Sequence, residues 1–222
     1  MIMMAEGTHS ENFTAGFDYN FGFGFYAGLK SMYNSNASAQ LIDALNVSEY
    51  AGAVGDQQVV RYITNHDVNG SDGTPLELFT GKKGSLAAFI PAAYMKGVPM
   101  IYNGQEVGFQ TRITFPFTSV KIDWTINPDV TADYKKLLAF RNSSTALRQG
   151  SLTSYSNADV CAFTKELAGQ KILVLVNLRN AVISYPVPMA IANTTWADAL
   201  NGGSVTVGTQ VSLQPFGYYV LK

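Results

Sequence analysis

The sequence predicts an α/β fold over residues 1–148 and a small antiparallel β domain of sandwich type over residues 149–222. Two observations support this prediction. Up to about Arg148, short and continuously apolar runs alternate with helical stretches, which is the pattern of βα units around a parallel sheet buried on both faces. After Arg148-Gln-Gly150, short strands follow one another with turn signals between them.

The first part contains three apolar runs typical of strands and four segments that favour helix. The strands are expected at 2–5, 59–63 and 98–102. The helices are expected at 21–33, 37–45, 83–95 and 131–147. The last of them is amphipathic, with Tyr134, Leu137, Leu138, Phe140 and Leu147 on or near one face.

The second part is expected to hold only strands, at 159–164, 171–178, 182–187, 203–213 and 217–221. Turn residues separate them at Ala168-Gly169, Asn201-Gly-Gly203 and Pro215-Phe-Gly217. Cys161 is the only cysteine, so an internal disulfide is excluded and the cellular compartment stays open. Its place in an alternating apolar run favours a buried structural thiol.

Charge and composition argue against several classes of partner. The chain has 15 basic and 16 acidic residues, whereas a nucleic-acid binder usually carries a basic stripe. No stretch approaches the ~18 to 20 apolar residues of a membrane span. The run Met1–Ala5 is too short for a signal peptide and has no basic flank. We expect it to be a buried strand of a domain that starts further upstream.

Polar residues follow each of the three apolar strands at its carboxyl end. Glu6 follows the first, His66 and Asp67 the second, and Gln105 and Glu106 the third. In α/β barrels these strand ends converge on one mouth, where the chemistry is assembled. Glu6 and Asp67 are therefore candidates for one site. A metal hydrolase and a Ser-His-Asp triad are both poorly supported, since HExxH, CxxC and G-x-S-x-G motifs are absent from the sequence.

Each candidate also has a structural interpretation. A glutamate after a strand, such as Glu6, is often a helix cap or a surface residue. Asn65-His-Asp67 fits a turn, Glu106 fits a loop-orienting role, and His9 fits a loop beside the pocket. One run of aromatics fits either a sugar-stacking wall or core packing: Phe13, Phe17, Tyr19, Phe21, Phe23 and Phe25.

Three stretches resemble the alpha-amylase family of glycoside hydrolases (family 13), in that family's order. Tyr62-Ile-Thr-Asn-His-Asp67 resembles the conserved region in which a strand ends in Asn-His-Asp. Gly97-Val-Pro-Met-Ile-Tyr-Asn-Gly-Gln-Glu-Val-Gly108 resembles the last barrel strand and its loop. Tyr134-Lys-Lys-Leu-Leu-Ala-Phe-Arg141, followed by Ala146-Leu-Arg-Gln-Gly150, is similar to the helix that leads into the carboxy-terminal β domain. The resemblance implies a partial (β/α)8 TIM barrel, about strands five to eight, within residues 1–148.

The resemblance also implies roles for individual residues. Ile2-Met-Met-Ala-Glu6-Gly7 looks like the fifth barrel strand with its general-acid glutamate, which assigns that role to Glu6. Asp67 would stabilise the transition state by holding sugar hydroxyls. His66, Asn65 and His9 would bind the substrate.

The family's nucleophile is an aspartate that would precede Met1, and neither Asp18 nor Asp56 matches it in order or context. A retaining glycosidase needs two carboxyl groups about 5 to 5.5 Å apart. We therefore expect the chain to be inactive alone. Open edges of a half barrel predict a homodimer or a rearranged half barrel. No metal or other cofactor is expected in this chain, because the family's calcium ligands lie largely upstream.

The predicted function is part of a retaining hydrolase of α-1,4-glucosidic bonds, with starch or maltodextrins as partner and no nucleic acid or membrane. Two alternatives stay open. One is a neopullulanase, cyclomaltodextrinase or branching-type relative, and the other is a non-catalytic glucan-binding protein. Residues 149–222 are expected to stabilise the barrel, although Trp196, Tyr218 and Tyr219 are aromatics that a sugar could contact.

Overall fold

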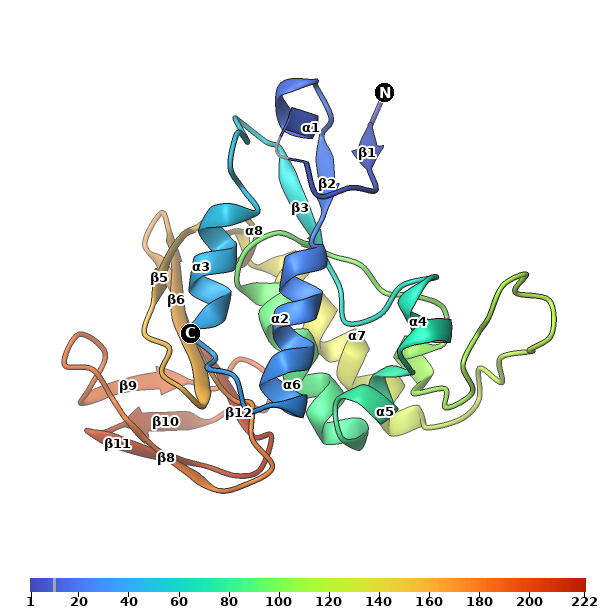
Figure 1. The fold of residues 1–222 in the computed structure, drawn as a ribbon. Helices are drawn as coiled ribbons and strands as arrows, with labels where there is room; N and C mark the ends of the chain where they lie inside the picture. Colours follow the sequence, from blue (N-terminus) through green and yellow to red (C-terminus); the bar gives the residue numbers. More distant parts are fainter. Residues whose placement is uncertain (10) are drawn as a thin grey trace.

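A computed structural model describes residues 1–9 and 11–222 of the chain. Figure 1 shows parallel strands at one end, a group of helices in the middle and antiparallel strands on the side away from the long loop formed by residues 108–127. The predicted α/β class is confirmed. Within the described ranges, no helix combines the length and the apolar character that crossing a membrane requires.

Four short parallel strands form one sheet in chain order. They are β1 (Met4–Ala5), β2 (Tyr19–Phe21), β3 (Gln58–Arg61) and β4 (Val98–Pro99). Three lie in or overlap the predicted runs, although Met1, Ile2 and Met4 of the run expected to be a buried strand are exposed. In contrast, β2 occupies the start of the predicted helix at 21–33, which begins only at Phe23. The prediction failed there because Asn20, a buried polar residue, interrupts the apolar pattern of this strand.

The helices are α1 (Glu11–Thr14), α2 (Phe23–Asn34), α3 (Leu41–Ser48), α4 (Val68–Ser71), α5 (Pro75–Leu78), α6 (Gly81–Tyr94), the 3-10 turn η1 (Gln105–Val107), α7 (Pro128–Ser143) and α8 (Thr145–Gln149). The helix predicted at 131–147 is thus two helices. Ser144 separates them, because its backbone is extended and its Oγ accepts a bond from the Leu147 N–H that caps α8.

Helix α6 lies at the centre of the core, buried throughout from Gly84 to Tyr94. Only glycine fits at position 84, because a Cβ would lie 1.7 Å from the carbonyl oxygen of Phe79. Helix α3 is tied to β3 by Glu49, whose Oε2 lies 2.8 Å from Nη2 of the buried Arg61. These contacts fix the helices that support the carboxyl ends of the parallel strands.

The antiparallel part consists of a four-stranded sheet in the order β12-β7-β6-β5 and two strand pairs, β8 with β11 and β9 with β10. Its strands are β5 (Ser151–Ser154), β6 (Val160–Leu167), β7 (Gln170–Asn177), β8 (Ile183–Pro186), β9 (Thr194–Ala197), β10 (Ser204–Val207), β11 (Gln210–Leu213) and β12 (Tyr218–Leu221). The sequence did not predict β5 and β9, and the strand predicted at 203–213 is divided into β10 and β11.

Both faces of β6 and β7 are buried, which explains their continuous apolar runs. Cys161 and Val174 pack with the helices, whereas Ala162 and Leu175 pack against the outer strand pairs. Cys161 is a fully buried thiol, as expected, and burial raises its pKa to about 12. The helices and β6–β7 share one core, which therefore continues across the predicted division between residues 148 and 149.

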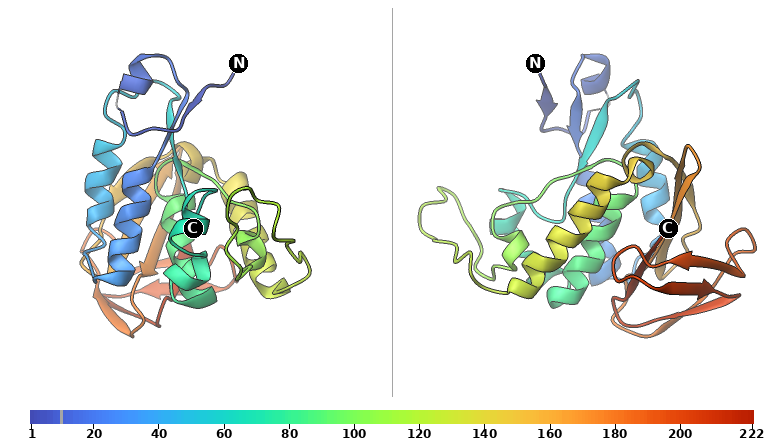
Figure 2. Two further views of the ribbon diagram at one scale, coloured as in Figure 1. Left: turned by 45° about the vertical axis from the view of Figure 1, so that its right-hand side comes forward. Right: turned by 180° about the vertical axis from the view of Figure 1, so that it is seen from behind.

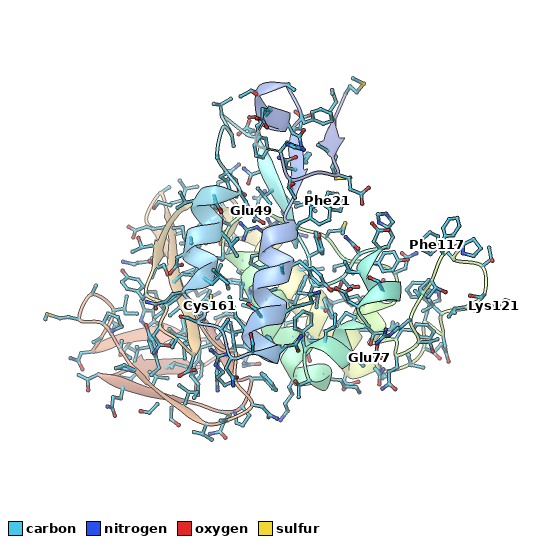
Figure 3. The ribbon with its side chains drawn as sticks, viewed as in Figure 1. Phe21, Glu49, Glu77, Phe117, Lys121 and Cys161 are labelled. Atoms are coloured by element: carbon cyan, nitrogen blue, oxygen red, sulfur yellow. The ribbon has the colours of Figure 1, made fainter. Side chains whose placement is uncertain are left out.

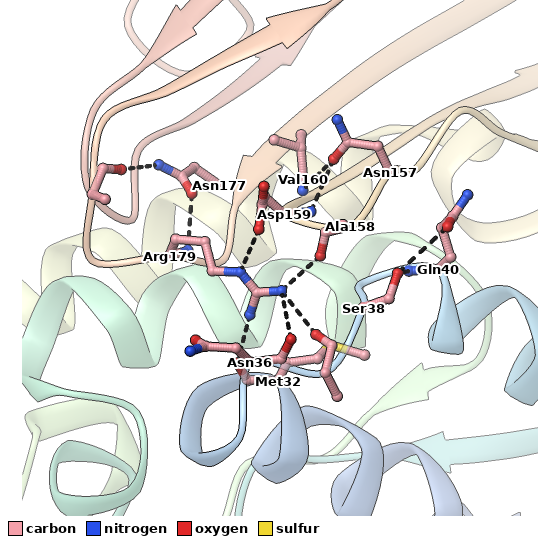
Figure 4. Close-up of polar contacts among 12 residues, drawn as sticks. Met32, Asn36, Ser38, Gln40, Asn157, Ala158, Asp159, Val160, Asn177 and Arg179 are labelled. Carbon is pink, nitrogen blue, oxygen red and sulfur yellow. Dashed lines mark hydrogen bonds and ion pairs between the residues drawn. The ribbon is translucent and has the colours of Figure 1, made fainter.

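Arg179 joins the two parts of the chain through polar contacts (Figure 4). It follows β7, and its guanidinium donates to the carbonyl oxygens of Met32, Ala37 and Ala158 at 2.6, 2.8 and 2.6 Å. Its Nε donates to Oδ1 of Asp159 at 2.8 Å. The end of α2 is thereby bound to the antiparallel part.

Candidate active site

Three side chains meet at the carboxyl ends of β1 and β3. Glu6 lies sixty residues before His66 and Asp67 in the chain. Nε2 of His66 lies 3.4 Å from Oε1 of Glu6 and 3.6 Å from Oδ1 of Asp67. Their donor and acceptor atoms all lie within 4.8 Å of one another. The side chains are 46% (Glu6), 43% (His66) and 67% (Asp67) exposed, so the group is open to solvent.

Asn65 shapes the turn that presents His66 and Asp67. Its Oδ1 accepts bonds from the backbone N–H groups of Asp67 at 3.0 Å and Val68 at 2.8 Å, which starts α4. The side chain is fully buried. Its observed contacts are therefore structural, in line with the turn interpretation, and its substrate-binding role stays a prediction.

His9 is not part of this group. Its Nδ1 lies 3.9 Å from Oε2 of Glu11, and both side chains are strongly exposed. Its carbonyl oxygen accepts a bond from the Asn20 side chain of β2. The structure thus records local contacts for His9, and its role toward a substrate also stays a prediction.

Aromatic rings pack around Tyr62, which lies just before the turn that carries His66 and Asp67. The Tyr62 ring lies 5.6 Å from that of Phe21, 5.5 Å from that of Tyr26 and 6.3 Å from that of Phe23. Phe13 and Phe25 are buried in the core, so they match the packing interpretation and cannot form a sugar-stacking wall. Burial, Glu49 and Glu6 together raise the pKa of Tyr62, which keeps its hydroxyl protonated at neutral pH.

Two buried polar atoms beside the site have no hydrogen-bond partner among the described residues: the Tyr62 hydroxyl and Nδ2 of Asn65. Buried polar groups are nearly always paired with protein, water or ligand. Burial raises the pKa of the Tyr62 hydroxyl and the Asn65 side chain acts on it to lower that pKa in part, so the two buried groups lie beside each other and do not by themselves indicate a ligand.

A cavity of about 520 Å³ adjoins His66 and Asp67 and is lined on its far side by Thr114, Phe115 and Phe117. The two phenylalanine rings lie 5.6 Å apart, edge to face, and are 84% and 40% exposed. Figures 2 and 3 show the loop that carries Phe117 projecting away from the antiparallel strands. Exposed rings of this kind are an apolar surface on which a sugar ring can stack.

Helix α4 holds this aromatic loop beside the site. Oδ1 of the buried Asn69 accepts a bond from the Ile113 N–H at 2.8 Å. A Cβ at Gly70 would lie 3.2 Å from the carbonyl oxygen of Ile113, so the glycine permits the close approach. Sequence reasoning missed Phe115 and Phe117, although the alternation Phe115-Pro-Phe117 in a polar stretch was a usable signal.

The residues after the third predicted strand have structural contacts. Gln105 is buried, and its Nε2 donates to the Tyr134 hydroxyl at 3.0 Å. The carbonyl oxygen of Glu106 accepts a bond from Oγ1 of Thr131 at 3.1 Å. Both residues join η1 to α7, in line with the loop-orienting interpretation of Glu106.

Two carboxylates and one imidazole can do two kinds of chemistry here. They can exchange protons with a polar ligand and stabilise positive charge on it, or their oxygen and nitrogen atoms can ligate a divalent cation. Exposed groups at ion-pair distances are compatible with both kinds of chemistry, so the comparison of folds is needed to choose between them.

No protein-family profile and no curated relative matches the sequence. Solved structures do. An alpha-amylase from Geobacillus thermoleovorans, in complex with acarbose, superposes with a TM-score of 0.79 at 14% identity, over 99% of this chain and 52% of that one. The fold is shared with alpha-amylases. An Anoxybacillus alpha-amylase gives a TM-score of 0.77 at 15% identity, over 99% of this chain and 52% of that one.

A third match is the cyclic α-maltosyl-(1→6)-maltose hydrolase of Arthrobacter globiformis, with a TM-score of 0.76 and 19% identity over 99% of this chain and 49% of that one. The chain thus spans about half the length of the structures it matches. At such low identity the comparison establishes the fold. The resemblance to the alpha-amylase family is confirmed at that level, and the shared half is consistent with a carboxy-terminal portion.

Proposed function

We propose that this chain is the carboxy-terminal portion of a retaining glycoside hydrolase of α-1,4-linked glucans. One observation carries the proposal: Glu6, His66 and Asp67 meet at the carboxyl ends of β1 and β3, in a fold shared with alpha-amylases. The substrate class is supported by the neighbours, since one is in complex with acarbose and another is named as a hydrolase of a cyclic maltosyl-maltose.

In this proposal the three side chains divide the work. Glu6 donates a proton to the leaving glycosidic oxygen as the bond breaks. Asp67 accepts hydrogen bonds from sugar hydroxyls and stabilises the positive charge that develops on the ring. Nε2 of His66 faces both carboxylates, so its N–H can pair with one of them or with a sugar oxygen. Phe115 and Phe117 bound the adjoining cavity and would stack on further glucose units.

We also propose that another segment supplies the nucleophile. Among the described residues, the group within 4.8 Å has only three members. Oδ2 of Asp18 accepts a hydrogen bond from the Met3 N–H at 2.7 Å, so this carboxylate holds the backbone just before β1. Asp56 lines a different cavity, near the amino ends of β3 and β4. Neither aspartate approaches Glu6, and the chain alone would form no glycosyl-enzyme intermediate.

The finer fold assignment belongs to the same proposal. The parallel strands would be strands five to eight of a (β/α)8 barrel, and residues 149–222 its carboxy-terminal β domain. Among the described residues, β1 and β4 each pair on one side only. Exposed Met1, Ile2 and Met4 lie at the β1 edge. An upstream segment or a second copy of the chain would cover such an edge, and the oligomeric state in solution tests the second case.

The first experiment incubates the purified chain with maltoheptaose and soluble starch and follows reducing sugar, beside a Glu6→Gln control. We expect no release by either protein. Restoring the upstream coding segment should then give activity that Glu6→Gln lacks. Cleavage of pullulan or cyclodextrins by the restored enzyme would instead identify a neopullulanase or cyclomaltodextrinase specificity. A restored protein that binds maltoheptaose without cleaving it would leave the glucan-binding alternative.

Activity of the chain alone would contradict the missing-nucleophile argument. If Glu6→Gln and Asp67→Asn both abolished that activity, the two carboxylates would themselves be the catalytic pair. Their oxygens lie within 4.8 Å, close to the spacing of about 5 to 5.5 Å in retaining enzymes.

A further inference from the structure

A second cavity lies at the opposite ends of the parallel strands from Glu6 and Asp67. Its volume is about 530 Å³. It is lined by the segment that leads into β3, by the residues just before β4, by Arg148–Gly150 at the end of α8, and by Lys165 of β6. Sites for small molecules have volumes of about 300 to 1,000 Å³, so this cavity is large enough to hold one.

Positive charge dominates this cavity. Lys96, Arg148 and Lys165 line it, and the one carboxylate among its lining residues is the exposed Asp56. In the described part of the chain, no carboxylate lies within ion-pair distance of any of the three cations. A surplus of cations that no side chain neutralises favours an anionic ligand.

Lys165 is the most unusual of the three. It is only 5% exposed, and neither a hydrogen bond nor an ion pair holds its ammonium group within the described ranges. Burial, with Lys96 and Arg141 nearby, lowers its pKa to about 8. The stem of the side chain is buried, but Nζ is not among the fully buried, unpartnered atoms of the described residues, so the ammonium reaches the cavity and lacks a counter-charge there. An anion in the cavity would provide that counter-charge.

The other lining groups are suited to hold a ligand in place. Lys96 is anchored, since its Nζ donates to the carbonyl oxygen of Asn46 at 3.0 Å and lies 3.8 Å from the centre of the Tyr50 ring. The side-chain amides of Gln57, Gln58 and Gln149 also line the cavity. The cavity therefore combines fixed charge with several hydrogen-bonding groups.

Asp43 is the nearest competitor for these lysines. It lines an adjoining cavity together with Lys96 and Lys165. Its buried Oδ1 has no hydrogen-bond partner, and neither lysine lies within ion-pair distance of it. Burial raises the pKa of Asp43 above its ordinary value. One such carboxylate does not neutralise the three cations.

We propose that this cavity binds a small molecule that carries a phosphate group, with Lys165, Lys96 and Arg148 as its cationic contacts. A phosphate monoester carries about −1.5 to −2 charges at neutral pH, which matches several cations better than a single carboxylate does. Lysine binds phosphate as a point charge, and arginine binds it through parallel N–H groups. This site does not depend on the function proposed for Glu6 and Asp67.

Isothermal titration calorimetry of the full chain tests the proposal with three ligands: inorganic phosphate, glucose 6-phosphate and glucose. Sodium chloride keeps the ionic strength constant throughout. We expect heat of binding for the two phosphate compounds and none at this site for glucose. Tighter binding of glucose 6-phosphate than of inorganic phosphate would identify a phosphorylated molecule as the ligand, and equal affinities would identify the phosphate group alone.

Variants locate the binding. Lys165→Met and Arg148→Gln should each weaken phosphate binding by about tenfold or more, as expected for a lost charged contact. Arg148 is exposed, so Arg148→Gln tests the site even if Lys165→Met changes the fold. Lys171→Gln, on the neighbouring strand β7 and paired with Glu166, is the matched control and should bind normally. Absence of binding by both phosphate compounds, or binding unchanged in both variants, would overturn the proposal.

Discussion

Replacement of Arg179 by methionine should destabilise the protein more than any surface substitution. The guanidinium is nearly buried and donates to three carbonyl oxygens and to Asp159 at distances of 2.6 to 2.8 Å. Methionine keeps much of the side-chain volume but donates nothing. The carbonyl oxygens at the end of α2 and before β6 would then lose their partners where water has little access.

The magnitude follows from the type of contact. A hydrogen bond to a charged group contributes about 1.5 to 3 kcal/mol, and such values do not add. Leaving a buried carbonyl oxygen without its donor costs about 1 to 3 kcal/mol, and three carbonyl oxygens lose Arg179 at once. Asp159 is itself partly exposed, so its ion pair adds little. We expect Arg179→Met to lower the free energy of unfolding by about 3 to 5 kcal/mol, a large part of a typical total.

Urea unfolding followed by circular dichroism and by tryptophan fluorescence measures this loss. The matched control is Arg112→Met, because Arg112 pairs with Glu77 at 3.2 Å on the exposed surface. That change should cost about 0 to 1 kcal/mol. If Arg179→Met is as mild as its control, the polar junction does not hold the two parts together, and the shared apolar core alone does.

Three further predictions concern a helix cap, acid stability and metal ions. Ser144→Ala should lower the free energy of unfolding by about 1 kcal/mol in urea, because it removes the cap of α8. A hydrogen bond from Lys30 lowers the pKa of Asp72 in the folded protein. The stability that the Asp72 carboxylate contributes is therefore present above its pKa in the unfolded chain, about 3.9, and is lost as the pH falls through its pKa in the folded protein. In the variant Asp72→Asn, the melting temperature should therefore fall less steeply as the pH is lowered. An unchanged slope of melting temperature against pH would contradict this prediction. EDTA should leave the binding of maltoheptaose unchanged. Excess Zn²⁺ should compete with maltoheptaose at Glu6 and His66. A loss of maltoheptaose binding after treatment with EDTA would instead assign a metal ion to the site.

The strands that sequence reasoning located are those whose apolar character is continuous. The run at 59–63 is fully buried, whereas the run at 98–102 is continuously apolar but only partly buried. Strand β2 was missed because Asn20 is buried in it. Its Oδ1 accepts a bond from Nδ2 of Asn12 at 2.8 Å, and its own Nδ2 donates to the carbonyl oxygen of His9. A buried polar residue whose hydrogen bonds are all made within the protein cannot be recognised from the pattern of apolar residues.

Strands β5 and β9 were missed for a different reason. Both lie at an edge of their sheet and alternate partly buried with exposed residues over only four positions. Ser151 to Ser154 contains one aliphatic side chain, Leu152. A strand of this kind forms because the adjacent strand offers unpaired backbone N–H and C=O groups. The presence of that adjacent strand is a property of the tertiary structure and cannot be read from the local sequence.

The candidate site was predictable to the extent that strand ends determine it. Glu6, His66 and Asp67 could be grouped from the sequence because parallel strands end on the same edge of a sheet. Phe115 and Phe117 stand out in the sequence as apolar residues of a polar stretch, but their place beside the site could not be predicted, since it depends on the bond between Asn69 and Ile113 across more than forty residues. Local patterns carry no information about a contact of that length.

The two ends of the parallel sheet carry opposite charge, which has a consequence for ligand binding. The carboxyl ends carry Glu6 and Asp67, whereas the cavity at the amino ends is lined by Lys96 and Lys165. A phosphorylated ligand is therefore repelled at the first site and attracted at the second, while a neutral glucan has no such preference. Inorganic phosphate should thus leave the affinity for maltoheptaose unchanged in calorimetry at constant ionic strength. Competition between the two would mean that phosphate binds at the carboxyl ends, against the sign of the local charge. Mutual strengthening would mean that β3, which contributes to both sites, transmits a change from one end to the other.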